Sequence, residues 1–161
     1  MPIKILFICH GNICRSPMAE FTMKALVKAR GLEDWYYIES AAVSGEETGN
    51  PIYPPAKRCL TQHGMAFDNA KRARKVVPED YDRFDRLICM DSSNVRLLSR
   101  IIPEDPKKKI HLLMSYTALD RGIGFNSGSG RDVADPWYTG DFERSFQDIL
   151  SGCEAMLDSL F

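Results

Sequence analysis

The chain has 161 residues, 44% hydrophobic and 27% charged, as is typical of one globular domain with a full core. Its formal net charge is only −1, so no overall field draws it to nucleic acid or to an anionic membrane surface. It has no apolar run of the ~18 residues that cross a membrane, and no signal peptide is recognisable. We expect a single domain over residues 1–161, a monomer or weak dimer with no nucleic-acid or membrane partner.

The predicted elements alternate along the chain. Strand patterns lie at 3–8, 36–43, 86–90 and 109–114, and helical patterns lie at 17–30, 54–63, 78–84, 92–101 and from about Asp141 onward. Such alternation predicts right-handed crossovers and an α/β fold of three layers, a parallel sheet with helices on both faces. We interpret 115–140 as a surface loop, and its glycine-rich part, Gly122–Gly130, as mobile and not as a cofactor site.

The five cysteines indicate a reducing compartment. An odd number of cysteines without a secretory signal favours free thiols in the cytoplasm. Cys89 falls in an apolar strand and Cys153 on the apolar face of the last helix, so both are expected in the core. The spacings form no Cys-x-x-Cys pair, so we expect no metal site and no cofactor.

The most informative segment follows the first strand. Cys9 opens a short loop and Arg15 closes it, with five residues between them. The backbone N–H groups of such a loop, together with the start of the next helix, can hold a phosphate-sized anion. Arg15 adds a planar bidentate donor. The same positive field favours the thiolate form of Cys9 and predicts a nucleophile.

The residues within and after the loop support this interpretation. Gly11 and Asn12 tolerate the unusual backbone angles of an anion cradle. Ser16 and Pro17 are typical of a helix start, with Ser16 as the N-cap and Pro17 as the first helical residue. The alternative is an ordinary strand–helix turn with a buried structural cysteine and a surface arginine.

The segment Cys9–Glu20 resembles the phosphate-binding loop of the low-molecular-weight protein tyrosine phosphatases. The resemblance continues in order through Ser40–Val43, Cys59 to Gly64, Cys89–Asp91 with Asn94, and Asp135–Tyr138. It implies a four-stranded parallel sheet in the order 2-1-3-4. It also implies that Asp135, in an Asp-Pro-aromatic-aromatic loop, is the general acid.

The chemistry implied is hydrolysis of a phosphate monoester, from a tyrosine-phosphorylated protein or a small aryl phosphate. Cys9 attacks phosphorus to give a phosphocysteine, and Asp135 protonates the phenolate and later activates water, with inorganic phosphate as product. Arg15 and the loop backbone hold the phosphate; the loop residues are His10, Gly11, Asn12, Ile13, Cys14 and Ser16. The Ser16 hydroxyl either donates to the Cys9 thiolate or caps the helix.

Several supporting residues have two interpretations each. Asn12 is a left-handed loop residue and a brace of the cradle. The resemblance makes His63 the partner that braces Asn12, while its position alone fits a helix C-terminus. Asp91 is interpreted as the cap of the following helix. Trp137 and Tyr138 are either core residues or an apolar wall against a phenyl ring.

The rim of the cleft departs from the family pattern. Glu46 and Glu47 stand where animal members place an aromatic wall, and an acidic rim disfavours acidic phosphopeptides. His10 stands where many members carry an apolar residue, and it either makes binding pH-sensitive or faces outward. Cys14 is either an apolar filler or a trap for oxidised Cys9. The basic run Lys71–Lys75 is interpreted as a solvated loop, with a docking patch as the alternative.

Three other functions stay open. The first is a protein-arginine phosphatase, although those relatives carry Thr where this chain has Ile13, whose bulk suits a phenyl ester. The second is a thioredoxin-coupled arsenate reductase, which needs further redox cysteines on a mobile segment. The third is a non-catalytic phosphopeptide-binding module, which would not need Cys9 as a thiolate or Asp135 as an acid. Phosphorylation of Tyr138 is a further open question.

Overall fold

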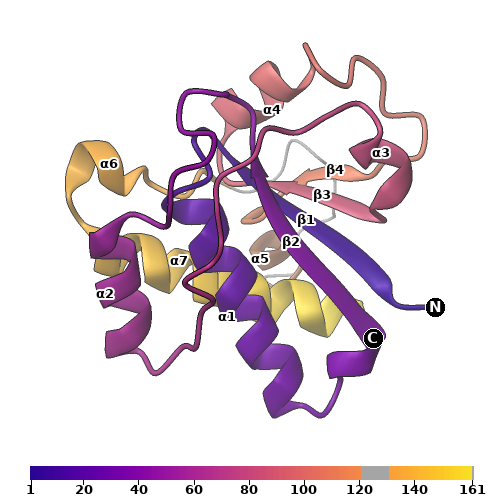
Figure 1. Ribbon diagram of the computed structural model, residues 1–161. Helices are drawn as coiled ribbons and strands as arrows, with labels where there is room; N and C mark the ends of the chain where they lie inside the picture. The colour runs from indigo at the N-terminus through magenta and orange to yellow at the C-terminus, as the bar shows by residue number, and fades with distance from the viewer. Residues whose placement is uncertain (121–130, 161) are drawn as a thin grey trace.

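The computed structural model describes residues 1–120 and 131–160. Its centre is a parallel four-stranded sheet in the order β2-β1-β3-β4, which confirms the predicted topology (Figure 1). The strands are β1 (Ile3–Cys9), β2 (Tyr36–Ala42), β3 (Arg86–Cys89) and β4 (Ile110–Leu112).

Helices cover both faces of this sheet, as the alternating pattern predicts. The helices are α1 (Arg15–Ala29), α2 (Pro54–Gln62), α3 (Asp80–Arg83), α4 (Ser92–Leu98), α5 (Ser115–Asp120), α6 (Pro136–Thr139) and α7 (Phe142–Ser159), with a 3-10 turn η1 (Glu33–Trp35). The helices α1, α2, α5 and α7 gather on one side of the sheet, and α3 and α4 lie on the other (Figure 1).

Strand β1 explains where the site lies. Its side chains alternate between two apolar clusters: Ile5 and Phe7 pack toward α1 and α7, whereas Leu6 and Ile8 pack toward α4. These four side chains are fully buried, as expected for a central parallel strand. The strand ends at Cys9, at the carboxyl edge of the sheet where α/β proteins place their ligand sites.

Some predicted boundaries were wrong. The stretch 115–140 was expected to be a loop, but it contains α5 and α6. The whole of Gly122–Gly130 lies outside the described residues. Helix α4 ends at Leu98 and not at residue 101, because the next residues form a turn. Cys89 and Cys153 are buried, as predicted. Within residues 1–120 and 131–160, no helix is long and apolar enough to cross a membrane.

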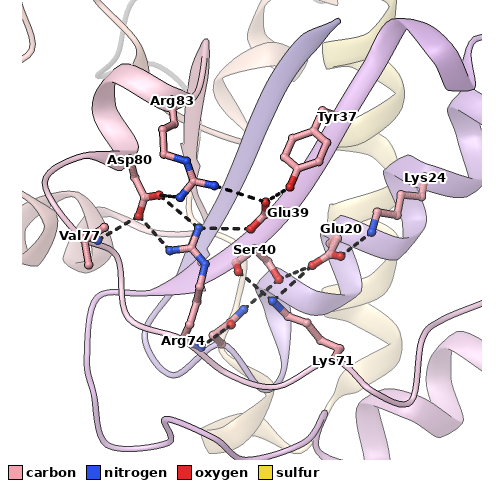
Figure 2. Close-up of polar contacts among 11 residues, drawn as sticks. Glu20, Lys24, Tyr37, Glu39, Ser40, Lys71, Arg74, Val77, Asp80 and Arg83 are labelled. Atoms are coloured by element: carbon pink, nitrogen blue, oxygen red, sulfur yellow. Dashed lines mark hydrogen bonds and ion pairs between the residues drawn. The ribbon is translucent and has the colours of Figure 1, made fainter.

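The basic run Lys71–Lys75 is a solvated loop only in part: Arg72 and Lys75 are exposed, as predicted, but Lys71 and Arg74 are not. Figure 2 shows Lys71 and Arg74 lying against β2. Lys71 donates from Nζ to the Ser40 carbonyl at 2.9 Å, and Arg74 donates from Nη1 to Asp80 at 2.9 Å. Burial lowers the pKa of Lys71. Buried acidic partners therefore hold part of this run on the sheet edge, which a pattern of consecutive charges does not reveal.

Candidate active site

Asn12 shapes the loop that follows β1. Its φ of 62° is in the left-handed region, as predicted, and its backbone N–H donates to Cys9 Sγ at 3.3 Å. Its side-chain amide donates to the Oγ atoms of Ser16, at 2.8 Å, and Ser40, at 2.9 Å. Its Oδ1 accepts the backbone N–H of Arg74 at 3.2 Å. Asn12 thus ties the loop to β2 and to the basic run.

The first helix begins earlier than predicted, and this changes the position of Ser16. Helix α1 begins at Arg15 with Cys14 as its N-cap, so Ser16 lies inside the first turn and is not the N-cap. Pro17 is tolerated there because N–H groups of the first turn have no helical partner. The Ser16 Oγ lies 3.0 Å from Cys9 Sγ, which agrees with the alternative role of supporting the thiolate.

Arg15 is fixed at the base of the cleft. It is only 2% exposed, and its Nη1 donates to Asp91 Oδ2 and to the Val133 carbonyl, both at 2.8 Å. Its Nη2 lies 3.4 Å from Asp135 Oδ2. Burial alone would lower the pKa of Arg15, but the negative charges of Cys9, Asp91 and Asp135 together raise it. The guanidinium is therefore charged and held in place before an anion arrives.

Asp91 has the predicted capping role and a second one. It caps α4 by accepting the backbone N–H of Asn94 at 2.8 Å, in a reciprocal capping box. Its other oxygen accepts from Arg15. Burial opposes ionisation of Asp91, yet the Arg15 charge and the hydrogen bonds to Arg15, Asn94 and Ser93 lower its pKa overall. One carboxylate thus both begins α4 and orients the arginine.

Asp135, from the C-terminal part of the chain, lies beside Arg15 in the cleft. It is the N-cap of α6, and its Oδ1 accepts the backbone N–H of Trp137 at 3.1 Å while its Oδ2 faces Arg15. Trp137 and Tyr138 are exposed, which excludes the alternative that they are core residues. The ring centroids of Trp137 and Tyr53 are 5.0 Å apart.

These groups surround one cleft of about 380 Å³, within the range of small-molecule sites. Its lining includes every residue predicted for the catalytic set and the cleft wall: Cys9, Arg15, Asp135, Glu46, Glu47, Trp137 and Tyr138. His10, Gly11, Ile13, Cys14 and Asp91 also line it, and Asn12 and Ser16 support it from below. His10 is exposed at the rim of the cleft, where its Nε2 lies 3.7 Å from Glu46 Oε2.

His63 does not brace Asn12, contrary to the prediction. It ends α2, where its Nε2 pairs with Glu143 Oε1 at 2.7 Å and its ring stacks on Phe146 with centroids 4.0 Å apart. The position of His63 before a glycine correctly indicates a helix end. The direction of its side chain depends on the packing of α2 against α7, which no local pattern contains.

Sequence reasoning missed two buried groups behind the loop. Ser40 donates to Glu20 Oε1 at 2.6 Å, and Glu20 is only 4% exposed (Figure 2). Lys24 and Lys71 pair with Glu20 at 2.7 Å and 3.6 Å. The available signal is a serine inside an otherwise apolar strand, since a buried hydroxyl needs a partner. The missed residues of the cleft itself are Ser93, Arg96 and Leu97 on α4, and Tyr53 was missed as the ring that packs against Trp137.

Cys14 differs sharply from Cys9 in its surroundings. Burial, reinforced by the negative charge of Cys9, raises the pKa of Cys14 to about 12, so it is a protonated thiol at neutral pH. Cys14 is free in the structure, as are the other four cysteines. Of the two thiols in the loop, only Cys9 has both an Oγ partner and a backbone N–H directed at its sulfur.

Comparison with known proteins gives a consistent result. The family model described as "Low molecular weight phosphotyrosine protein phosphatase" matches residues 4–161. The Bacillus subtilis low molecular weight protein-tyrosine-phosphatase YfkJ is 38% identical, covering 98% of this chain and 96% of its own length. The crystal structure of YfkJ superposes with a TM-score of 0.88, covering 99% of this chain and 95% of that one.

Two animal proteins are also similar to this chain over nearly its whole length. The human low molecular weight phosphotyrosine protein phosphatase is 37% identical, covering 96% of this chain and 93% of its own. The crystal structure of a Drosophila arginine phosphatase is 31% identical with a TM-score of 0.80, and it covers 98% of both chains. Because the family model and both curated relatives span nearly the whole chain, this protein belongs to the low molecular weight phosphotyrosine protein phosphatase family.

Proposed function

We propose that this protein hydrolyses phosphotyrosine through a phosphocysteine on Cys9. One observation supports the proposal most: Cys9 and Arg15, from one loop suited to an anion, line the same cleft as Asp135, which comes from a distant part of the chain. A thiolate nucleophile, a fixed cation and a carboxylic acid can together carry out phosphoryl transfer without a metal. The relatives named as tyrosine phosphatases support the same reaction.

The first step is transfer of the phosphoryl group to sulfur. The backbone N–H groups of residues 10–15 and the Arg15 guanidinium bind the phosphate oxygens and offset the charge of the transition state. The Cys9 thiolate attacks phosphorus, and the bond from phosphorus to the tyrosine oxygen breaks. Asp135, protonated at this stage, gives its proton to that oxygen, because a phenol with a pKa of about 10 leaves more easily once protonated.

The second step returns the enzyme to its starting state. Asp135, now a carboxylate, takes a proton from a water molecule as that water attacks the phosphocysteine. The phosphorus–sulfur bond breaks, inorganic phosphate leaves, and Cys9 is again a thiolate. The Ser16 hydroxyl stabilises the sulfur charge at the start and at the end of the cycle. The proposed cycle uses no metal and no cofactor.

The mouth of the cleft supports a preference among phosphorylated substrates. Trp137 and Tyr138 supply apolar surface for a phenyl ring, while Glu46 and Glu47 add negative charge on the rim. We therefore propose tyrosine-phosphorylated proteins with basic residues near the phosphotyrosine, and small aryl phosphates, as substrates. Acidic phosphopeptides are disfavoured by the charge of Glu46 and Glu47.

Phosphoarginine is the second candidate substrate, because one structural relative is an arginine phosphatase. Ile13 favours the tyrosine ester, since its apolar side chain lines the cleft where a phenyl ring would lie. Peptides of one sequence carrying phosphotyrosine or phosphoarginine discriminate the two. A larger kcat/KM for the phosphotyrosine peptide supports our proposal, and the reverse order contradicts it.

The compartment and assembly state are part of the proposal. Five free, buried cysteines fit a reducing compartment, and we propose the cytoplasm. We propose a monomer or weak dimer, because the cleft contains its own nucleophile, cation and acid. Sedimentation over a range of protein concentrations tests the assembly state, and an obligate dimer would contradict it.

The direct test is hydrolysis of an aryl phosphate with EDTA present. The wild type is expected to retain its activity in EDTA, and Cys9→Ser is expected to lose it. Asp135→Ala is expected to fall about 100-fold or more on phenyl phosphate and less on esters with better leaving groups. Loss of wild-type activity in EDTA, or activity in Cys9→Ser, would contradict the mechanism.

A further inference from the structure

Outside the catalytic cleft, three side chains of metal-ligand type meet between α2 and α7. Cys59 and His63 are four residues apart at the end of α2, and Glu143 lies in the first turn of α7. Their ligand atoms all lie within 4.8 Å of one another. None of the three lines the catalytic cleft. Thiolate, imidazole and carboxylate are the three ligand types that zinc accepts.

The spacing of the ligand atoms is close to what a metal needs. Zinc bonds of about 2.0–2.3 Å in a tetrahedron place ligand atoms about 3.4 Å apart. The His63 Nε2 to Glu143 Oε1 distance is 2.7 Å, so these two atoms would separate slightly, and the Cys59 sulfur lies within 4.8 Å of both. The Glu143 side chain is 55% exposed, so it can move without disturbing the core. Its exposure also gives an ion a route from solvent.

The surroundings fix the histidine and one carboxylate oxygen. The His63 ring stacks on Phe146 at 12° between planes, which limits its rotation. Gln147 donates to Glu143 Oε2 at 2.8 Å and leaves Oε1 directed at His63. Such second contacts are what orient ligands in known metal sites.

The contacts around the three ligands leave a place for a cation. The Cys59 thiol donates a hydrogen bond to the Phe142 carbonyl at 3.6 Å, and metal binding would replace this bond. Within the described parts of the chain, Glu143 forms an ion pair with His63 but with no Lys or Arg. A divalent ion would neutralise both the Glu143 carboxylate and a Cys59 thiolate.

We propose that Cys59, His63 and Glu143 bind one divalent cation of the zinc class, with water as the remaining ligand. The Cys59 S–H bond breaks, its proton goes to solvent, and no electron is transferred. The ion joins the end of α2 to the start of α7 and so stabilises the fold. This goes beyond the proposed catalysis and differs from the expectation that the chain has no metal site.

The bound ion would lie close to the acid loop without entering it. Phe142 is the neighbour of Glu143 in the sequence, and its ring centroid lies 6.1 Å from that of Tyr53. The Tyr53 ring in turn packs against Trp137, in the loop of Asp135. The ion therefore holds the start of α7, the helix that follows the Asp135 loop.

Cobalt(II) is the probe, because its spectrum reports thiolate ligation and tetrahedral geometry. The titration uses the full chain with Cys9→Ser and Cys14→Ser, which removes both cleft thiols, and compares it with the wild type. We expect a thiolate-to-cobalt band that saturates at one equivalent and is displaced by zinc. Binding strengthens as pH rises, because one proton is released. Zinc also raises the melting temperature of this variant.

Substitutions of the ligands provide the controls. Adding Cys59→Ser is expected to abolish the band and the zinc-dependent stabilisation. Glu143→Gln, on the surface, is expected to weaken binding about tenfold or more, and it tests the proposal even if the Cys59 variant does not fold. A titration with no thiolate band, or a band unchanged by Cys59→Ser or by Glu143→Gln, overturns the proposal. Hydrolysis of aryl phosphate is a separate readout, so failure here leaves the catalytic proposal unaffected.

Discussion

The Oγ atom of Ser16 lies 3.0 Å from the Sγ atom of Cys9 and accepts a hydrogen bond from the Asn12 amide at 2.8 Å. Because the amide fills one acceptor site of the hydroxyl, the hydroxyl proton is available for the sulfur, which lies nearer than the other acceptor, the Ala41 carbonyl at 3.5 Å. A hydroxyl inside the first turn of α1 therefore supports the nucleophile. The Asn12 amide orients this hydroxyl, and Ser40 on β2 holds the same amide in place.

Ser16→Ala tests this relationship. A hydrogen bond to a charged group contributes about 1.5–3 kcal/mol. We therefore expect the rate of Cys9 alkylation by iodoacetate at neutral pH to fall about 10- to 100-fold, and kcat to fall by a similar factor. Ser99→Ala is the matched control, because the Ser99 hydroxyl is exposed and donates only to the Arg96 carbonyl. Equal alkylation rates in the wild type and Ser16→Ala would show that the hydroxyl does not support the sulfur.

Asp91→Asn tests the carboxylate that orients Arg15. Removing one partner of a charged hydrogen bond is expected to cost about 2 kcal/mol of unfolding free energy at neutral pH. The pKa of Asp91 is lowered in the fold. Its stabilisation is therefore present above the unfolded pKa of about 3.9 and is lost as pH falls through the lower folded value.

Urea unfolding from neutral to acidic pH measures this effect. The difference between wild type and Asp91→Asn is expected to shrink below about pH 4. Asp158→Asn, in an exposed pair with Arg30, is the control and is expected to change stability by less than about 1 kcal/mol. A constant wild-type to Asp91→Asn difference across the pH range would contradict the assignment.

The acidic rim predicts a charge-dependent substrate preference. We expect the wild type to favour phosphotyrosine peptides with flanking lysines over those with flanking glutamates. Replacing both Glu46 and Glu47 by Gln is expected to reduce that ratio of kcat/KM severalfold, and added salt to reduce it in the wild type. Glu33→Gln, outside the cleft, is the control. A ratio that is insensitive to salt and to both substitutions would exclude the rim as its source.

Gly152 allows α7 to approach Leu113, the residue that follows strand β4. A Cβ atom at this position would lie 2.6 Å from Cγ of Leu113, which is fully buried. Gly152→Ala is therefore expected to destabilise the fold by about 1–3 kcal/mol, measured by thermal or urea unfolding. Gly45→Ala is the matched control, since its nearest neighbour would be at 3.7 Å. Equal stability of the two variants would contradict the packing.

Much of the site could be predicted because its signals are local. A buried strand that ends in Cys9, an arginine at the end of the loop and a left-handed Asn12 are all visible over a few residues. Asp135 followed by Pro136 is also a local helix-start signal, and it indicates α6 although we interpreted the stretch as a loop.

The errors concern partners that only the folded chain brings together. Ser16 has the preferences of an N-cap, but the backbone of the anion loop already begins α1 at Arg15. His63 turns to Glu143 because α7 covers α2. The basic run is held by Glu20, Glu39 and Asp80, which lie on three separate elements (Figure 2). The contacts of His63 with Glu143 and of Lys71 with Glu20 span long stretches of sequence, whereas Arg74 and Asp80 are close along the chain but meet only because of the turn between them.

The most direct measurement is mass spectrometry of the Cys9 peptide after rapid acid quenching of Asp135→Ala during turnover of p-nitrophenyl phosphate. This variant lacks the base for the second step, and its substrate needs little protonation, so the intermediate accumulates. We predict one phosphoryl group on Cys9 and none on Cys14. Turnover without a phosphoryl group on Cys9, or a phosphoryl group on another residue, would contradict the mechanism.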